Sequence, residues 1–248
     1  MRWILGTRVD STSYELATRQ VVDWARRAES RYVCAANVHM LMEAHDDASF
    51  REAVGRAALV TPDGMPLVWV MRRLGVKNQQ RVYGPDLTLH VARAASEQSI
   101  PIGLYGGTPQ TLARLSGNLK LQYPGLHIAY AFSPPFHPMS PEEDAQATDE
   151  IIRSGARILF VGLGCPKQER WMAEHQDRIP AVMLGVGAAF DIHAGEKPQA
   201  PAWMQSAGLE WLFRLASEPR RLWRRYLYHN PRFVILVLLQ LLRQNRNP

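Results

Sequence analysis

The chain has 248 residues, of which 46% are apolar, enough to bury a substantial core in one large domain or two small ones. Its cysteines, Cys34 and Cys165, lie in or beside apolar runs, which favours a reduced, intracellular protein over a disulfide scaffold. No apolar run approaches the roughly 20 residues that span a bilayer. The first residues, MRWILGTRVDST, do not fit the pattern of a secretory signal.

The net charge of +6 belongs to the last part of the chain. Residues 214–248 contain eight arginines, no lysine and one acid, so this segment carries +7 and residues 1–213 carry −1. The sequence therefore predicts a nearly neutral body with a cationic appendage.

Strands and helices alternate along the body. We expect strands at 4–9, 31–36, 57–61, 101–105, 128–132, 158–161 and 181–186. Helical spacing follows at about 12–28, 38–44, 65–74, 86–95 and 167–175, and Ser140 with Glu143 has the spacing of a capping box. This alternation predicts an α/β fold with a mainly parallel, Rossmann-like sheet flanked by helices. The composition changes near 198–201, so we expect an α/β catalytic body at 1–197 and a helical appendage at 198–248.

One stretch, ILFVGLGCPKQERW at 158–171, carries the clearest local pattern. An uncharged apolar run suited to a buried strand leads through Gly162, Gly164 and Pro166 into a predicted helix. The N-terminus of such a helix presents unpaired N–H groups, which often bind phosphate. An ordinary strand–turn–helix connection has the same pattern, so this stretch alone leaves both interpretations open.

Several polar or glycine positions directly follow a predicted strand. They are Asn37, Asp63, Gly106, Gly107, Gly164 and Asp191. If the strands are parallel, these positions meet at the rim where ligands of open α/β sheets bind. Local explanations also exist, since Asn37 fits a helix cap and Asp63 and Asp191 fit turns that satisfy nearby backbone groups. The eight histidines show no HExxH spacing and no CxxC occurs, so we expect no metal site.

The cationic appendage has the pattern of a helix at a membrane surface. On a helix through 220–227, four arginines fall in one arc, and Leu222, Trp223, Tyr226 and Leu227 fall in the opposite one. Phe233–Leu242 adds an apolar run too short to span a bilayer but suited to partial insertion. The alternative is a C-terminal helix that packs on the core and exposes its arginines.

Five stretches in order resemble the WecG/TagA/CpsF family, glycosyltransferase family 26. They are TPDGMPLVW (61–69), RVYGPDL (81–87), VGLGCPKQERW (161–171), GVGAAFDIHAG (185–195) and APAWMQSAGLEWLFRLASEPRRLWRRY (200–226). The resemblance implies an inverting, metal-independent transferase of bacterial cell-envelope polysaccharide synthesis. Its expected donor is a UDP-sugar, its acceptor is a sugar on a polyprenyl diphosphate, and it uses no cofactor. The expected location is cytoplasmic, on the inner face of the cell membrane.

The resemblance also suggests roles for individual residues. Asp63 matches the family's proposed general base, and Arg81 and Gln168 would stabilise the departing UDP. No Asp-x-Asp motif occurs, so side chains and helix N-termini would replace a metal ion. The expected substrate contacts are Asn37, Tyr105, Gly106, Gly107, Gly164, Lys167, Asp191, Arg214, Arg221 and Arg224. Ala35 occupies the threonine position of the family's Thr-x-Asn pattern, which leaves the donor sugar open.

Other classes of protein remain possible from the sequence. An NAD(P)-dependent oxidoreductase fits glycine-rich turns, although no G-x-G-x-x-G follows the first strand. A non-catalytic, membrane-associated adaptor that binds nucleotide sugars fits the appendage but has no need of Asp63 or Gln168. Nucleic-acid binding is disfavoured because the arginines alternate with Trp, Leu and Phe. The apolar appendage is also compatible with a homo-oligomer.

Overall fold

The computed structural model describes residues 1–135 and 137–244 of the chain. Residue 136 and residues 245–248, which include Arg246, lie outside this part. The centre of the molecule is a six-stranded sheet in which every neighbouring pair of strands is parallel, in the order β4-β3-β8-β7-β5-β6. The strands are β3 (Arg31–Ala36), β4 (Leu59–Pro62), β5 (Ile102–Gly106), β6 (Ile128–Phe132), β7 (Ile158–Gly162) and β8 (Val182–Gly185). The predicted α/β fold is confirmed.

The strand predicted at 4–9 is wrong, because this segment folds back on itself. Strand β1 (Arg2–Ile4) pairs antiparallel with β2 (Thr7–Val9), outside the main sheet. Leu5 and Gly6 connect them with φ angles of 49° and 80°. Positive φ at both central residues characterises the tight turn that suits the twist of a hairpin. The apolar pattern was read correctly, but the turn inside it was not recognised.

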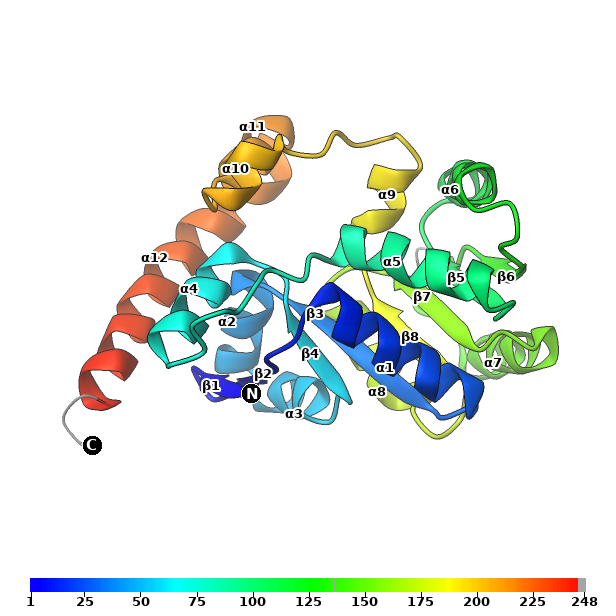
Figure 1. Ribbon diagram of the computed structural model, residues 1–248, viewed down its shortest axis with the longest axis horizontal. Helices are drawn as coiled ribbons and strands as arrows, with labels where there is room; N and C mark the ends of the chain where they lie inside the picture. The colour runs from blue at the N-terminus through cyan, green and yellow to red at the C-terminus, as the bar shows by residue number, and fades with distance from the viewer. Residues whose placement is uncertain (136, 245–248) are drawn as a thin grey trace.

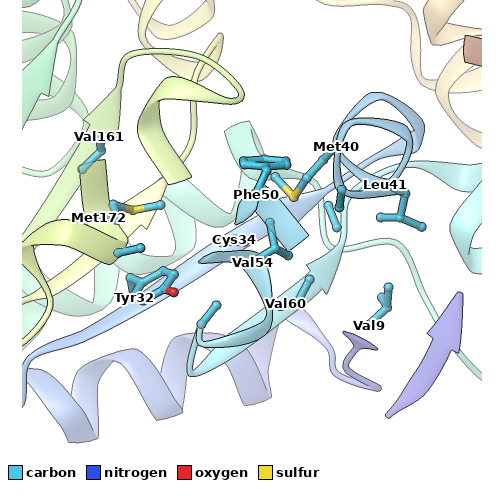
Figure 2. Close-up of a cluster of buried hydrophobic side chains, with 14 of the residues drawn as sticks. Val9, Tyr32, Cys34, Met40, Leu41, Phe50, Val54, Val60, Val161 and Met172 are labelled. Carbon is cyan, nitrogen blue, oxygen red and sulfur yellow. The ribbon is translucent and has the colours of Figure 1, made fainter. Parts of the chain in front are cut away.

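Helices cover both faces of the sheet because side chains alternate along each strand. On one face, Tyr32 and Cys34 pack against Phe50 and Met172 in a continuous apolar core, shown in Figure 2. The helices that contribute to this face are α2 (Val38–Asp46), α3 (Ala48–Gly55), α4 (Met65–Arg73), α7 (Pro141–Ser154) and α8 (Lys167–His175). On the opposite face, Val33 belongs to a second core with α1 (Tyr14–Arg26), α5 (Gly84–Glu97), α6 (Pro109–Gln122) and α9 (Ala189–His193).

Capping side chains explain where several helices begin. Asn37, Thr108 and Ser140 each accept a hydrogen bond from a backbone N–H in the first turn of the next helix, and the predicted capping box of Ser140 with Glu143 is present. The sequence pattern predicted neither α3 nor α6. Helix α3 has only eight residues, too few to establish a clear period.

The appendage consists of three helices that lie against the body. Helices α10 (Ala202–Ser206) and α11 (Glu210–Ser217) precede α12 (Pro219–Gln244), which runs beside α2 and α4 in Figure 1. Phe233 and Val237 of α12 belong to the same buried core as the first face of the sheet. Within the described residues, no helix is both long and apolar enough to cross a membrane.

The arginine face and the apolar face predicted for α12 do not match its exposed and buried faces. Leu222 is fully buried, whereas Trp223 and Leu227, predicted on the same face, are 46% and 67% exposed. Arg225 turns inward, although it was predicted to lie with the exposed arginines. The exposed groups are instead separated along the helix, with Arg220, Arg221 and Arg224 near its start and exposed aliphatic side chains from Val234 onward. Packing on the body decides which face of the helix is hidden.

Candidate active site

The adjacent ends of β3 and β4 bring two of the predicted site residues together. Ala36 pairs with Pro62 in the sheet, so Asn37 and Asp63 follow neighbouring strands at the same rim. Asn37 caps α2 through a 3.2 Å hydrogen bond from the N–H of Met40. Asp63 Oδ1 accepts a 2.6 Å hydrogen bond from the N–H of Gly84, at the start of α5. Both local roles that the sequence left open are therefore present, and they fix the two side chains at the rim.

The surroundings of Asp63 raise the pKa of its carboxyl group. Burial raises the pKa of its carboxyl to about 6; Arg81 opposes this shift and Glu210 adds to it. A carboxyl with this pKa is mostly ionised near pH 7 yet has more affinity for a proton than an exposed aspartate. Asp63 is thus able to accept a proton under physiological conditions.

Arg81 connects the rim to the appendage. Its Nε donates to the backbone carbonyl of Asp63, and its Nη2 pairs with Glu210 of α11. Its Nη1 lies 3.2 Å from Oε1 of Gln205, and its guanidinium lies 3.8 Å from the centre of the Tyr83 ring. Arg81 is therefore part of a network of contacts with the rim and with the appendage.

Glu210 is a site residue that the sequence analysis missed. It accepts hydrogen bonds from both Arg81 and the hydroxyl of Tyr83, the latter at 2.9 Å. It places a second carboxylate near Asp63, which contributes to the raised pKa of Asp63. The only signal in the sequence was an acidic residue in the otherwise apolar and basic stretch GLEWLFRL.

A pocket of about 520 Å³ opens between the rim and the appendage. Asn37, Asp63 and Arg81 contribute polar groups from the body, and Arg214 and Arg225 contribute cations from α11 and α12. Apolar side chains form another part of the wall: Trp69, Val70, Phe233, Val234, Val237 and Leu238. The pocket thus combines a carboxylate and cations with a surface suited to a hydrocarbon chain.

The predicted tail arginines have different surroundings. Arg214 lines the pocket, but Arg221 forms a 2.6 Å ion pair with Glu218 and Arg224 is exposed beside Trp223. Neither Arg221 nor Arg224 lines this pocket. Arg225, which was not predicted as a site residue, lines it instead. The helical arc computed from sequence could not show which arginine faces the body.

The 158–171 stretch forms the predicted strand, turn and helix. Gln168 is buried in the first turn of α8, where its Oε1 accepts from the N–H of Gly164 at 3.1 Å and its Nε2 donates to Glu169 at 2.7 Å. Lys167 is exposed at the same helix start. Gln168 therefore holds the turn after β7 in place, while the side chain of Lys167 is exposed to solvent.

The remaining predicted contacts lie at the ends of β5 and β8. Gly106 has a φ of 126°, and a Cβ there would lie 2.6 Å from the backbone of Gly162, so glycine is required. Gly107 has a φ of 67° in the same turn. Tyr105 is buried and stacked on Trp171 with ring centres 4.4 Å apart, so its ring has no face available for a base. Asp191 forms a 2.7 Å ion pair with Lys197.

A partly buried carboxylate and cations at the carboxyl ends of parallel strands lie where open α/β sheets bind their ligands. The sequence model of the Glycosyl transferase WecG/TagA/CpsF family matches residues 2–247. The chain belongs to this family of glycosyltransferases, which act in cell-envelope polysaccharide synthesis. Such enzymes in general use a nucleotide-sugar donor and a lipid-linked acceptor.

Proposed function

We propose that the protein is an inverting, metal-independent transferase that moves a hexose from a UDP-sugar to a sugar on a polyprenyl diphosphate. The hexose is of the N-acetylmannosamine or glucose type. One observation carries the proposal: the pocket places Asp63 and two arginines of the appendage beside an apolar wall. A lipid-linked diphosphate has the same combination of an anionic head and an apolar chain.

In the proposed reaction, Asp63 takes the proton from a hydroxyl of the acceptor sugar. The hydroxyl oxygen forms a bond to the anomeric carbon of the donor, and the bond from that carbon to the β-phosphate oxygen of UDP breaks on the opposite face. The configuration is therefore inverted. A positioned base of this kind contributes typically about 10²–10⁴ in rate.

The leaving UDP gains negative charge, which this chain would stabilise with its own groups. Arg81 supplies a fixed cation at the rim, and Lys167 with the start of α8 supplies a second positive region. Gln168 and the glycine turns after β5 and β7 hold the backbone N–H groups in place. Asp191 stays a candidate for the ribose hydroxyls. Arg214 and Arg225, which line the pocket, would bind the acceptor diphosphate, whereas the exposed Arg221 and Arg224 would contact a membrane surface.

The test measures transfer from a panel of UDP-sugars to a short-chain polyprenyl-diphosphate-linked sugar and determines the stereochemistry of the product. Asp63→Asn removes the base, so we expect turnover to fall by about 10²-fold or more while UDP still binds. Asp149→Asn, at an exposed position on α7, is the matched control and retains full turnover. Near-normal activity of Asp63→Asn, or a product with retained configuration, contradicts the mechanism.

The original chain and its Asp63→Asn variant also distinguish the proposed function from the two alternatives. An oxidoreductase would show a higher melting temperature with NAD(P) and not with UDP. A non-catalytic adaptor would show no transfer with any sugar, and Asp63→Asn would leave its biological function intact.

A further inference from the structure

Three side chains with metal-binding atoms lie together beside the active-site pocket. His39 and Glu43 are one turn apart on α2, and His229 reaches them from α12. The three offer ligand atoms that all lie within 4.8 Å of one another. Oε1 of Glu43 is 3.6 Å from Nδ1 of His39 and 3.4 Å from Nε2 of His229.

These separations are close to those of a tetrahedral metal site. Zinc binds imidazole nitrogen and carboxylate oxygen at about 2.0–2.1 Å, so two ligands in tetrahedral positions are roughly 3.4 Å apart. Both measured distances to Glu43 agree with this value to within a few tenths of an ångström. The two histidine nitrogens lie no more than 4.8 Å apart, a separation that side-chain rotations can adjust.

The two histidines have buried nitrogen atoms that lack a hydrogen-bond partner within the described residues. These atoms are both ring nitrogens of His39 and Nδ1 of His229, and all three are inaccessible to solvent. His229 as a whole is 8% exposed. Buried polar atoms without partners are uncommon because they lose their hydrogen bonds to water. An ion bound through Nδ1 of His39 and Nε2 of His229 would provide a partner for one of these three atoms, Nδ1 of His39.

A carboxylate supplies the negative charge that a cation site needs. Asp46 is itself paired with Arg232 through two contacts of 2.7 Å, so Glu43 provides the negative charge of the site.

We propose that His39, Glu43 and His229 bind a divalent transition-metal ion of the Zn²⁺ class, which fastens α12 to α2. Two imidazoles and one carboxylate favour zinc or cobalt over magnesium and calcium, which prefer ligands made only of oxygen. The fourth position of the ion is left for water. The sequence could not reveal this site because its third ligand comes from a distant helix, outside any short motif.

The proposed ion has no part in the transfer of sugar, since Asp63 is not among its ligands. Its effect is to hold the appendage in place. His39 follows Asn37 by two residues at the start of α2, and His229 lies on the same helix as Arg225. The ion would therefore connect the rim that carries Asp63 to the helix that carries a pocket arginine. This inference stands on the three ligands alone and does not depend on the proposed function.

The experiment uses the full-length chain without a histidine tag, first treated with EDTA and then titrated with Co²⁺. We expect one equivalent of Co²⁺ to produce the visible absorption of a tetrahedral site and Zn²⁺ to abolish it by displacement. Zn²⁺ should also raise the melting temperature by several degrees, because it binds the folded chain, whereas Mg²⁺ at the same concentration should not.

Variants assign the binding to these ligands. Glu43→Gln and His229→Ala should each weaken Co²⁺ binding by at least tenfold, with circular dichroism used to show that the variants are folded. His45→Ala, on an exposed side chain near the end of α2, is the matched control and should bind as the original chain does. Absence of one-equivalent binding overturns the proposal, and so does unchanged binding by a folded Glu43→Gln. Neither readout requires a sugar substrate, so failure of the transfer assay is a separate result.

Discussion

Glu169 is fully buried next to Gln168, and its Oε2 has no hydrogen-bond partner in the described part of the chain. Burial raises the pKa of its carboxyl to about 7, in spite of the hydrogen bond from Gln168. The position of Gln168, and with it the turn after β7, therefore depends on a carboxyl that changes its charge near physiological pH.

This pKa shift predicts a pH dependence of stability. Because the pKa is raised from an ordinary value of 4.5, the folded chain binds the proton more tightly than the unfolded chain. Protonated Glu169 contributes fully to the free energy of unfolding below about pH 4.5, and this contribution is lost as the pH rises through about 7. The loss lowers the free energy of unfolding by about 3 kcal/mol over that interval. Glu169→Gln removes this contribution while keeping an oxygen that can accept the hydrogen bond from Gln168.

The free energy of unfolding in urea, measured at several pH values from 4.5 to 8, checks this prediction. We expect the difference between the original chain and Glu169→Gln to change steadily across this range in favour of the variant. Asp63 is present in both proteins, so its own raised pKa cancels from the comparison. A difference that does not vary with pH contradicts the role of Glu169.

At the scale of elements, α12 determines whether the appendage is separate from the body. Its residues Phe233 and Val237 are 4% and 6% exposed and share the core formed by the sheet and α2. The ion pair between Arg81 and Glu210 joins α11 to the rim. Such contacts favour unfolding of the body and the appendage as one cooperative unit.

Phe233→Ala tests this coupling. Removing a buried phenylalanine leaves a cavity, so we expect the free energy of unfolding to fall by about 3–5 kcal/mol in a single transition. Val234→Ala is the matched control, because Val234 is the adjacent residue and is 54% exposed. A second transition, or loss of only the α12 signal while the body remains folded, shows instead that the appendage behaves as a separate domain.

At the scale of the whole molecule, exposed arginines and exposed apolar side chains both lie on α12, one group after the other. Arg220, Arg221 and Arg224 lie near the start of α12, and five aliphatic side chains farther along it are 46–59% exposed: Val234, Ile235, Leu238, Leu239 and Leu242. Basic side chains are attracted to an anionic membrane surface, and exposed apolar side chains can insert into it. We therefore expect peripheral attachment through α12, the location predicted from the sequence.

The double variant Ile235→Ser and Leu239→Ser tests this attachment without disturbing the core. Each exchange removes about 2 kcal/mol of apolar burial in lipid, so binding to vesicles that contain anionic lipid should weaken by about a hundredfold or more. Cosedimentation measures the binding, and Leu121→Ser, at an 82% exposed position on α6, is the control. If the double variant binds vesicles as the original chain does but has a smaller molecular mass in solution, the exposed face instead joins two copies of the chain.

The sequence was sufficient where information is local. Apolar runs and turn residues located β3, β6 and β7 because strands in a sheet covered by helices contain few charges, and the capping box at Ser140 specified the start of α7. Ordered motifs along nearly the whole chain indicated the family. Positions after the strands identified Asn37 and Asp63, since parallel strands bring their carboxyl ends to one rim.

The tertiary structure decided what depends on contacts between distant segments. The order of the strands made Asn37 and Asp63 neighbours, and the docking of α11 brought Glu210 onto Arg81. The packing of α12 turned Arg225 inward and left Arg224 exposed, although both lie in one arc of the helix by sequence. A helical period defines relative angles around an axis, whereas the direction that faces the protein depends on the surface against which the helix packs.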